Sequence, residues 1–267
     1  MFIDIDNKKF FASNGGRKFD SNKKCIIFIH GAGMDHTVWF QQSRFFANKG
    51  FSVISIDLQG HGKSEGEASD DVKYIANSIS KVIDHLKIKE VAIVGHSLGA
   101  LISIELAKID TKIISELVLL GVCLPMNVSD ELLTNAQSNN QDALNFITMW
   151  GHSNFSHLGQ NIVPGIWLTG SSKKLLETSS KGVLFSDLMA VKNYKEDEKT
   201  LNKILCPTLI ICGSEDMMTP LKNVVILEKN INKLSKIVLP NCGHMMMLEE
   251  PDIVRSEIAS FLSSPSK

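Results

Sequence analysis

The stretch IVGHSLGAL, residues 93–101, decides how this chain is interpreted. An apolar run ends in Gly95-His96-Ser97-Leu98-Gly99 and another apolar segment follows, so the serine either belongs to a tight turn or is held at a corner for chemistry. A strand that becomes a helix within one residue forces Ser97 into a poorly populated backbone conformation, at a cost of roughly 1–3 kcal/mol. Glycines two residues before and after the serine let the corner pack without a Cβ. The motif G-x-S-x-G between a strand and a helix therefore favours Ser97 as a nucleophile.

Strands and helices alternate on both sides of this corner. Short apolar runs predict strands buried on both faces of a sheet, at residues 25–29, 51–57, 90–95, 115–122, 207–213 and 235–240. Helical patterns are found between them, at residues 37–50, 70–88, 98–108 and 221–231, and a last amphipathic helix is expected near 251–262. This alternation predicts an α/β fold, with a mostly parallel sheet and helices on both of its faces.

The alternation is interrupted between residues 124 and 200. That segment has no run typical of a buried strand and contains a polar helical stretch at 130–150 and a loop-like stretch at 151–172. We therefore expect an α/β core formed by residues 1–123 and 201–267, with residues 124–200 inserted as a mostly helical unit.

Two further residues are placed to activate the serine, whose hydroxyl is a weak nucleophile until a base removes its proton. His244 follows the last predicted strand, at the carboxyl edge of the sheet where Ser97 is also expected. Asp216 follows strand 207–213 at the same edge and could fix the tautomer of the imidazole. Glu215 is adjacent and competes, but Asp216 leaves the chain more room to turn after the strand. The order Ser97, Asp216, His244 predicts a catalytic triad.

A loop after the first buried strand could complete the site. A tetrahedral intermediate needs donors near its oxyanion, and losing one costs about 2.7–4 kcal/mol. His30-Gly31-Ala32-Gly33 can present the amide of Ala32 opposite that of Leu98, which is free to donate at the start of its helix. Gly31 and Gly33 allow the close approach. We expect His30 to pin this loop through hydrogen bonds rather than to act in catalysis.

The same loop has a second interpretation, as a dinucleotide-binding turn. Gly31-x-Gly33 lies between a strand and a helix, and Asp57 ends the next strand. The third glycine position of that fingerprint is His36, whose bulk would hinder close packing of helix and strand. Asp57 is better explained by the polar turn DLQGHGKS, residues 57–64. We therefore predict no nucleotide, no other cofactor and no metal site.

Composition argues against several function classes. The 28 Lys and Arg residues balance 29 Asp and Glu, and no basic stripe is visible, which argues against nucleic acid and anionic membrane surfaces as partners. No apolar run approaches the ~20 residues of a membrane span, and the start MFIDIDNKKFF is not an export signal. The five cysteines form no CxxC pair, which is typical of reduced core cysteines, so we expect a cytoplasmic protein.

Together these motifs resemble those of the α/β-hydrolase superfamily, in particular its cap-bearing group with serine nucleophiles. The matching segments occur in the family's order across nearly the whole chain: HGAG (30–33), DLQGHGKS (57–64), GHSLG (95–99), GSED (213–216) and GH (243–244). The resemblance implies an eight-stranded type of sheet and residues 124–200 as a cap. It also implies Ser97 as nucleophile, Asp216 as acid, His244 as base, and the amides of Ala32 and Leu98 as oxyanion hole. Dehalogenases and epoxide hydrolases of this fold carry aspartate where Ser97 stands, so we expect neither activity.

The inserted segment is expected to select the substrate, because the core supplies only the reaction. Trp150, His152 and Trp167 within it, and Met245 beside His244, are candidate substrate contacts in a partly apolar pocket. Such aromatic side chains serve more often in packing, and methionine usually fills gaps in a core.

These observations predict a serine esterase that cleaves a small carboxylic ester through an acyl-enzyme intermediate. The same triad also serves C–C bond hydrolases, lactonases and thioesterases, and a small-ligand receptor on a hydrolase fold is a further alternative. The expected partner is a small-molecule substrate, and the sequence does not define the oligomeric state.

Overall fold

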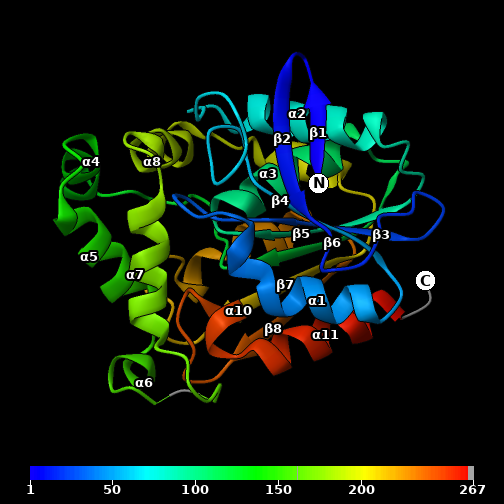
Figure 1. Ribbon diagram of the computed structural model, residues 1–267. Coiled ribbons are helices and arrows are strands. Elements are labelled where there is room, and N and C mark those ends of the chain that lie inside the picture. Colours follow the sequence, from blue (N-terminus) through cyan, green and yellow to red (C-terminus); the bar gives the residue numbers. More distant parts are fainter. Residues whose placement is uncertain (161, 264–267) are drawn as a thin grey trace.

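Eight strands form one sheet, in the order β1-β2-β4-β3-β5-β6-β7-β8, in the computed structural model, which describes residues 1–160 and 162–263 (Figure 1). Their bounds are β1 Phe2–Ile5, β2 Lys8–Ser13, β3 Cys25–Ile29, β4 Ser52–Ile56, β5 Val91–His96, β6 Ile114–Leu120, β7 Thr208–Gly213 and β8 Leu234–Leu239. Strands β3 to β8 are parallel, whereas β2 pairs antiparallel with both β1 and β4. The predicted α/β fold with a mostly parallel, eight-stranded sheet is confirmed.

The hairpin of β1 and β2 is missing from the sequence prediction. Its residues alternate between buried and more exposed positions, with Ile3, Ile5 and Phe10 turned into the core. Such alternation is typical of a strand with one solvated face, and it gives a weaker signal than the continuous apolar runs of the central strands.

Helices cover both faces of the sheet (Figure 1). On one face lie α2 Val72–His85 and α3 Leu98–Ile109. On the other lie η1 His36–Trp39, α1 Phe40–Asn48, α10 Met246–Glu249 and α11 Pro251–Ser263. The sequence-predicted helix 37–50 is thus a short 3-10 turn followed by α1, and the predicted helix 221–231 is divided in the same way, into η3 Leu221–Asn223 and α9 Val225–Asn230.

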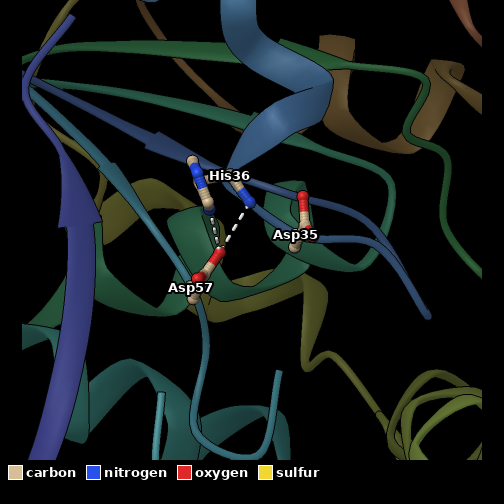
Figure 2. A group of neighbouring side chains, drawn as sticks. All are labelled: Asp35, His36 and Asp57. Carbon is tan, nitrogen blue, oxygen red and sulfur yellow. Dashed lines mark hydrogen bonds and ion pairs between the residues drawn. The ribbon is translucent and has the colours of Figure 1, made fainter. Parts of the chain in front are cut away.

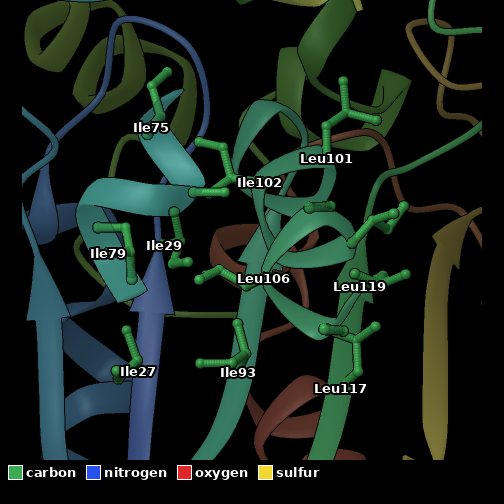
Figure 3. Close-up of a cluster of buried hydrophobic side chains, with 14 of the residues drawn as sticks. Ile27, Ile29, Ile75, Ile79, Ile93, Leu101, Ile102, Leu106, Leu117 and Leu119 are labelled. Carbon is green, nitrogen blue, oxygen red and sulfur yellow. The ribbon is translucent and has the colours of Figure 1, made fainter. Parts of the chain in front are cut away.

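Strand residues alternate between the two cores. Ile27, Ile93 and Leu117 of three neighbouring strands face α2 and α3, where Ile79 and Leu106 pack onto them (Figure 3). Each of these side chains is fully buried, which stabilises the fold by about 1.5–3 kcal/mol per residue. This packing fixes the positions of the strand ends, and therefore of the loops that follow them.

The segment between β6 and β7 forms helices, as predicted. Its elements are α4 Asp130–Gln137, α5 Gln141–Gly151, α6 Asn154–His157, α7 Leu168–Thr178, α8 Val183–Asn193 and the 3-10 helix η2 Glu198–Lys203. We call α4 to α8 the inserted helices. Their apolar side chains share a cluster of their own, which includes Leu132, Ile147, Leu184 and Leu188. In Figure 1 they lie together at one end of the sheet.

Two details of this segment differ from the sequence prediction. The helical stretch 130–150 is broken at residues 138–140, where the Asn140 side chain caps α5. The stretch 151–172 is not all loop, because it contains α6 and the first turn of α7, whereas residue 161 lies outside the described residues. Helix α7 was missed because it starts without a side-chain cap and carries Gly170 and two serines in its first turns.

All five cysteines are buried and unpaired, as expected for reduced core cysteines. Within the described ranges, no helix is both long and apolar enough to cross a lipid bilayer.

Candidate active site

Ser97 occupies the corner between β5 and α3. Its φ of 55° and ψ of −117° lie in a region that residues other than glycine rarely adopt. A Cβ on Gly95 would lie 2.3 Å from the carbonyl oxygen of Gly99, and one on Gly99 would lie 2.3 Å from the carbonyl oxygen of Ile29. The steric argument made from the motif is therefore confirmed: neither glycine can carry a side chain without moving the backbone.

His244 and Asp216 are brought together by the loops after β8 and β7. The Nδ1 of His244 lies 2.8 Å from Oδ2 of Asp216, and both residues are buried. An ionised carboxylate only accepts, so Nδ1 carries the proton and the other ring nitrogen, Nε2, keeps its lone pair. This is the tautomer that a general base requires.

Further donors keep the Asp216 carboxylate ionised. The Thr219 hydroxyl donates to Oδ2 at 2.5 Å, and the amides of Thr219 and Met218 donate to Oδ1 at 2.8 and 2.9 Å. Burial alone would raise the pKa of Asp216, but His244 and the Thr219 donors outweigh it and lower the pKa to about 2. Glu215, the competing candidate, instead accepts from the amide of Asn154 and takes no part in this pair.

Ser97 and His244 line the same cavity. The Ser97 hydroxyl has no hydrogen-bond partner among the described residues, so the link from serine to imidazole is not closed in this conformation. Catalytic hydrogen bonds often tighten only when a substrate is bound. The structure thus brings the three sequence-predicted residues to one site, with the imidazole and carboxylate already in contact.

His96 was not recognised from the sequence as part of the site. Its ring is fully buried, and Nε2 donates to the backbone oxygen of His244 at 3.0 Å. Burial and the neighbouring His244 hold the pKa of His96 well below its usual value, so the ring is neutral. His96 therefore fixes the backbone of the loop that carries His244, and the only sequence signal for this is its position next to Ser97 in the motif.

Gly121 at the end of β6 is a second residue that sequence reasoning missed. Its φ is 56°, and a Cβ there would lie 2.9 Å from both Cε1 and Nδ1 of the His244 imidazole. The glycine therefore leaves the space that the imidazole occupies. Its only local signal is a glycine directly after a buried strand.

The two expected oxyanion donors flank Ser97. Leu98 is the first residue of α3, and Ala32 lines the cavity. Among the described residues, neither amide donates to another protein group, so both are available to a substrate oxygen. Gly31 allows the close approach, because a Cβ there would lie 3.3 Å from Cβ of Ser97 and 2.8 Å from Nδ1 of His96.

His30 pins this loop, as predicted. Its Nδ1 donates to the carbonyl oxygen of Gly31 at 2.9 Å and its Nε2 accepts from the amide of Leu58 at 3.1 Å. The ring is fully buried, which lowers the pKa of His30 to about 4 and keeps it neutral.

Asp35, His36 and Asp57 gather close enough to resemble a metal site (Figure 2). Each is already explained by hydrogen bonds within the fold. Oδ1 of Asp57 accepts from both the amide and Nδ1 of His36, each at 2.7 Å, and its Oδ2 accepts from the amide of Lys63 at 2.9 Å. The Asp35 side chain caps η1 through Thr37. The cluster therefore ties two loops together, and both oxygens of the Asp57 carboxylate are engaged in these contacts.

A cavity of about 350 Å³ lies over Ser97 and His244. Most of its lining is apolar and comes from the inserted helices and the site loops. The lining residues are Ala32, Met34, Ser97, Met126, Asn127, Val128, Ser129, Leu132, Phe146, Ile147, Trp150, Gly151, Leu188, Val191, Met217, Met218, Thr219, His244 and Met245. Apart from the His244 imidazole, none of these described residues has an acidic or basic side chain.

The four predicted substrate contacts have different positions. Trp150 and Met245 line the cavity. His152 does not, because its Nδ1 donates to the carbonyl oxygen of Thr148 at 2.9 Å and its Nε2 meets the Ser172 hydroxyl at 3.0 Å. Trp167 is 73% exposed on the outer surface. We therefore retain only Trp150 and Met245 as candidate contacts.

Comparison with known proteins tests the fold and the broad activity. A family model described as alpha/beta hydrolase fold matches residues 24–251. The chain belongs to this family. A non-heme haloperoxidase of Rhodococcus erythropolis is 26% identical over 265 residues, covering 90% of this chain and 92% of that protein. An (E)-2-((N-methylformamido)methylene)succinate hydrolase of Acinetobacter baylyi is 24% identical over 246 residues, covering 90% of both chains.

A solved structure of similar shape is an esterase from Exiguobacterium antarcticum. It superposes on this alpha/beta hydrolase with a TM-score of 0.85 at 21% identity, covering 98% of this chain and 99% of the esterase. Together with the family match, the relatives support a hydrolase function.

Proposed function

We propose that this protein is a serine hydrolase that cleaves carboxylic esters with an uncharged, apolar acyl group. The observation that carries the proposal is the 2.8 Å contact between His244 and Asp216, made on the same cavity that the Ser97 corner lines. Two amides beside Ser97, those of Ala32 and Leu98, have no acceptor within the described part of the chain, and this supports the proposal.

In the proposed reaction, Nε2 of His244 takes the hydroxyl proton of Ser97 as its oxygen attacks the ester carbonyl. The carbonyl electrons move onto the oxygen, where the amides of Ala32 and Leu98 donate hydrogen bonds. When the tetrahedral intermediate collapses, the bond to the alcohol breaks and His244 returns the proton to the alcohol. Water then loses a proton to His244 and attacks the carbonyl carbon of the acyl-enzyme. When this second tetrahedral intermediate collapses, the bond to the Ser97 oxygen breaks, His244 returns the proton to that oxygen, and the acid leaves.

The cavity lining supports the acyl preference. Five methionines, Phe146 and Trp150 offer adaptable apolar contacts, and a carboxylate or phosphate would find no arginine or lysine among the described lining residues. Burying an unpaired charge there would cost several kcal/mol. An anionic acyl group is therefore disfavoured, and so is a coenzyme A thioester if its phosphates had to enter the cavity.

We also propose that residues 124–200 act as a cap on the core formed by residues 1–123 and 201–267. The inserted helices supply Leu132, Ile147, Trp150 and Leu188 to the cavity, whereas the core supplies Ser97. The cap would thus select the substrate by the shape and the apolar lining of the cavity.

The test is turnover of p-nitrophenyl butyrate by the wild type and by Ser97→Ala. The wild type should hydrolyse the ester, and the variant should lose at least a thousandfold in kcat, because the serine and its base act as a unit. A fluorophosphonate should label wild-type Ser97 and leave the variant unlabelled. Activity that survives in Ser97→Ala contradicts the proposal, and labelling of Ser97 without turnover of any ester would favour the receptor alternative.

A further inference from the structure

Asp187 on α8 is a fully buried carboxylate that lies outside the triad. Its Oδ2 accepts from the amide of Gly33 at 2.7 Å and from Nε2 of His61 at 2.8 Å. Its Oδ1 has no hydrogen-bond partner among the described residues. A buried carboxylate is costly unless a positive charge compensates it, so the state of His61 decides what this contact is.

The hydrogen bonds of His61 indicate an imidazolium. Its Nδ1 lies 3.0 Å from the carbonyl oxygen of Gln59, and its Nε2 faces the Asp187 carboxylate. Both partners are acceptors, so both ring nitrogens must carry protons. His61 and Asp187 are therefore a buried ion pair that joins the polar turn after β4 to α8.

The surroundings of His61 agree with this charge. Titratable groups face His61 from four elements. The His30 ring, after β3, lies 4.9 Å away between ring centroids. Asp57 follows β4, Asp187 lies on α8, and Tyr74 on α2 lines the same small crevice as His61. Burial lowers the pKa of His61, but the Asp187 carboxylate outweighs it and the pKa lies above the usual 6.5.

Gly33 is the residue directly after the oxyanion donor Ala32, and the inserted helices determine where it lies. Its φ is 68°, and a Cβ there would lie 3.0 Å from Cδ1 of Leu184 and 3.1 Å from Cδ2 of Leu176. The amide of Gly33 is thus held by Asp187, and its Cα packs against Leu176 of α7 and Leu184 of α8. Any shift of Asp187 would move the peptide next to the Ala32 amide.

We propose that the His61–Asp187 ion pair positions the oxyanion loop, which makes Asp187 and His61 positioning residues for hydrolysis. The inference rests on the proposed serine hydrolase function and adds that the cap contributes to catalysis as well as to substrate selection. One oxygen of Asp187 accepts both donors, so asparagine cannot replace it. With a neutral His61, an amide oxygen would face the lone pair of Nε2, and an amide NH₂ group would face the N–H of Gly33.

The test compares Asp187→Asn with Asp130→Asn, a control at another ion-paired carboxylate of the inserted helices that is exposed and bonds Lys192. Rates are expressed per active site, counted with the fluorophosphonate, so that misfolded protein does not contribute. Asp187→Asn should lower kcat roughly tenfold to a hundredfold with KM changed less than about threefold, as expected for misplaced catalytic groups. The control should match the wild type.

A double variant tests the hydrogen-bonding argument by rescue. When Asp187→Asn is combined with His61→Gln, the side-chain amide introduced at position 61 can donate to the oxygen of the introduced asparagine, which can then also accept from Gly33. The kcat of the double variant should exceed that of Asp187→Asn at least threefold. If Asp187→Asn keeps the wild-type kcat, or if the double variant is as slow as the single one, the inference is wrong. Wild-type activity that does not depend on Ser97 would instead refute the proposed function.

The wild type alone provides a test that needs no variant to fold. Nitrogen-15 NMR should find both ring nitrogens of His61 protonated at pH 7.5, and kcat should fall at high pH together with the loss of the His61 proton. A neutral His61 at pH 7.5, or a His61 titration that leaves kcat unchanged, overturns the proposal.

Discussion

Three histidines near the cavity are held in different states by their hydrogen-bond partners. His244 donates from Nδ1 to Asp216, and its Nε2 has no hydrogen-bond partner among the described residues, whereas His96 donates from Nε2 to the backbone of His244. His61 faces acceptors with both nitrogens. In the proposed hydrolase, one residue type would thus serve as a base, a neutral donor and a cation, because the neighbouring atoms decide which nitrogens carry protons.

Gly121 gives a residue-scale prediction about the imidazole. Gly121→Ala should lower kcat at least tenfold, because the new methyl group would occupy space 2.9 Å from His244 ring atoms. Gly50→Ala is the matched control, since Gly50 also has a positive φ, of 96°, but no atom of a described residue lies within 4 Å of its Cβ position. In urea unfolding, Gly50→Ala should lose about 1–2 kcal/mol from backbone strain. Gly121→Ala should lose at least as much, because its methyl group also contacts the buried imidazole. Equal kcat values in the two variants would contradict the role given to Gly121.

The raised pKa of His61 gives a prediction for how stability depends on pH. A histidine whose folded-state pKa lies above the unfolded value of 6.5 stabilises the fold fully below 6.5, and this contribution is lost as pH rises through the folded value. Wild-type unfolding free energy should therefore decline above neutral pH more steeply than that of the double variant of His61 and Asp187. Urea midpoints measured from pH 6 to 10 test this, and parallel curves would contradict it.

The site residues that could be predicted from the sequence are those that stand in a recognisable short motif. Ser97, Asp216 and His244 each stand in a short motif directly after a predicted strand, so their common edge follows from a parallel sheet. Asp187 stands in no such motif, and the only signal of Gly121 is a single glycine near the end of the predicted strand 115–122. The Asp187 carboxylate meets its partners across 126 and 154 residues of chain, a distance at which spacing carries no information.

Among the elements, α6 is tied to both loops that carry Asp216 and His244, the proposed acid and base. Glu215, next to Asp216, accepts from the amide of Asn154 at 3.0 Å. Glu249 of α10 accepts from the Ser153 amide at 3.0 Å and the Ser156 hydroxyl at 2.8 Å with one oxygen, and from the Gly243 amide at 3.2 Å with the other. This edge of the inserted helices is therefore fixed to the core.

Glu249 provides the element-scale prediction. Glu249→Ala should lower the free energy of unfolding by about 2–4 kcal/mol, because it leaves buried donors of α6 and of the base loop unpaired. Glu131→Ala, at an exposed position of α4, should change it by less than about 0.5 kcal/mol. Urea denaturation measures both, and a Glu249 variant as stable as the Glu131 variant would show that these contacts do not hold the inserted helices in place.

The elements missed by the sequence share a physical cause. Strands β1 and β2 form a hairpin at one end of the sheet and have a solvated face, and α7 begins without a cap, so neither region leaves a strong sequence signal. The central strands were predicted because burial on both faces requires continuous apolar runs. The weakly signalled elements depend for their stability on packing against the rest of the fold, which the local sequence pattern does not encode.

At the scale of the whole molecule, loops after β3, β5, β6, β7 and β8 meet at one edge of the sheet, and the inserted helices close over them (Figure 1). The cavity between them is large enough for a small acyl group and is lined mostly by apolar side chains. The sequence predicted the edge and the insertion, but not the cavity lining, because that depends on how the two parts pack together.

The cavity predicts a dependence on acyl chain length. Along p-nitrophenyl esters from acetate to hexanoate, kcat/KM should rise by up to roughly fourfold for each added methylene, since a buried CH₂ is worth about 0.8 kcal/mol. An ester of the same length with a terminal carboxylate should react at least a hundredfold more slowly. A preference for acetate, or for the anionic ester, would contradict the assignment of the acyl group to this cavity.

The most direct test of the central claim is to trap the acyl-enzyme. The wild type is mixed with p-nitrophenyl butyrate, quenched in acid within milliseconds to seconds, and digested for peptide mass spectrometry. The account predicts a butyryl group on the peptide that contains Ser97, on the serine itself, and none in Ser97→Ala. Steady turnover with the acyl group on another residue would contradict it.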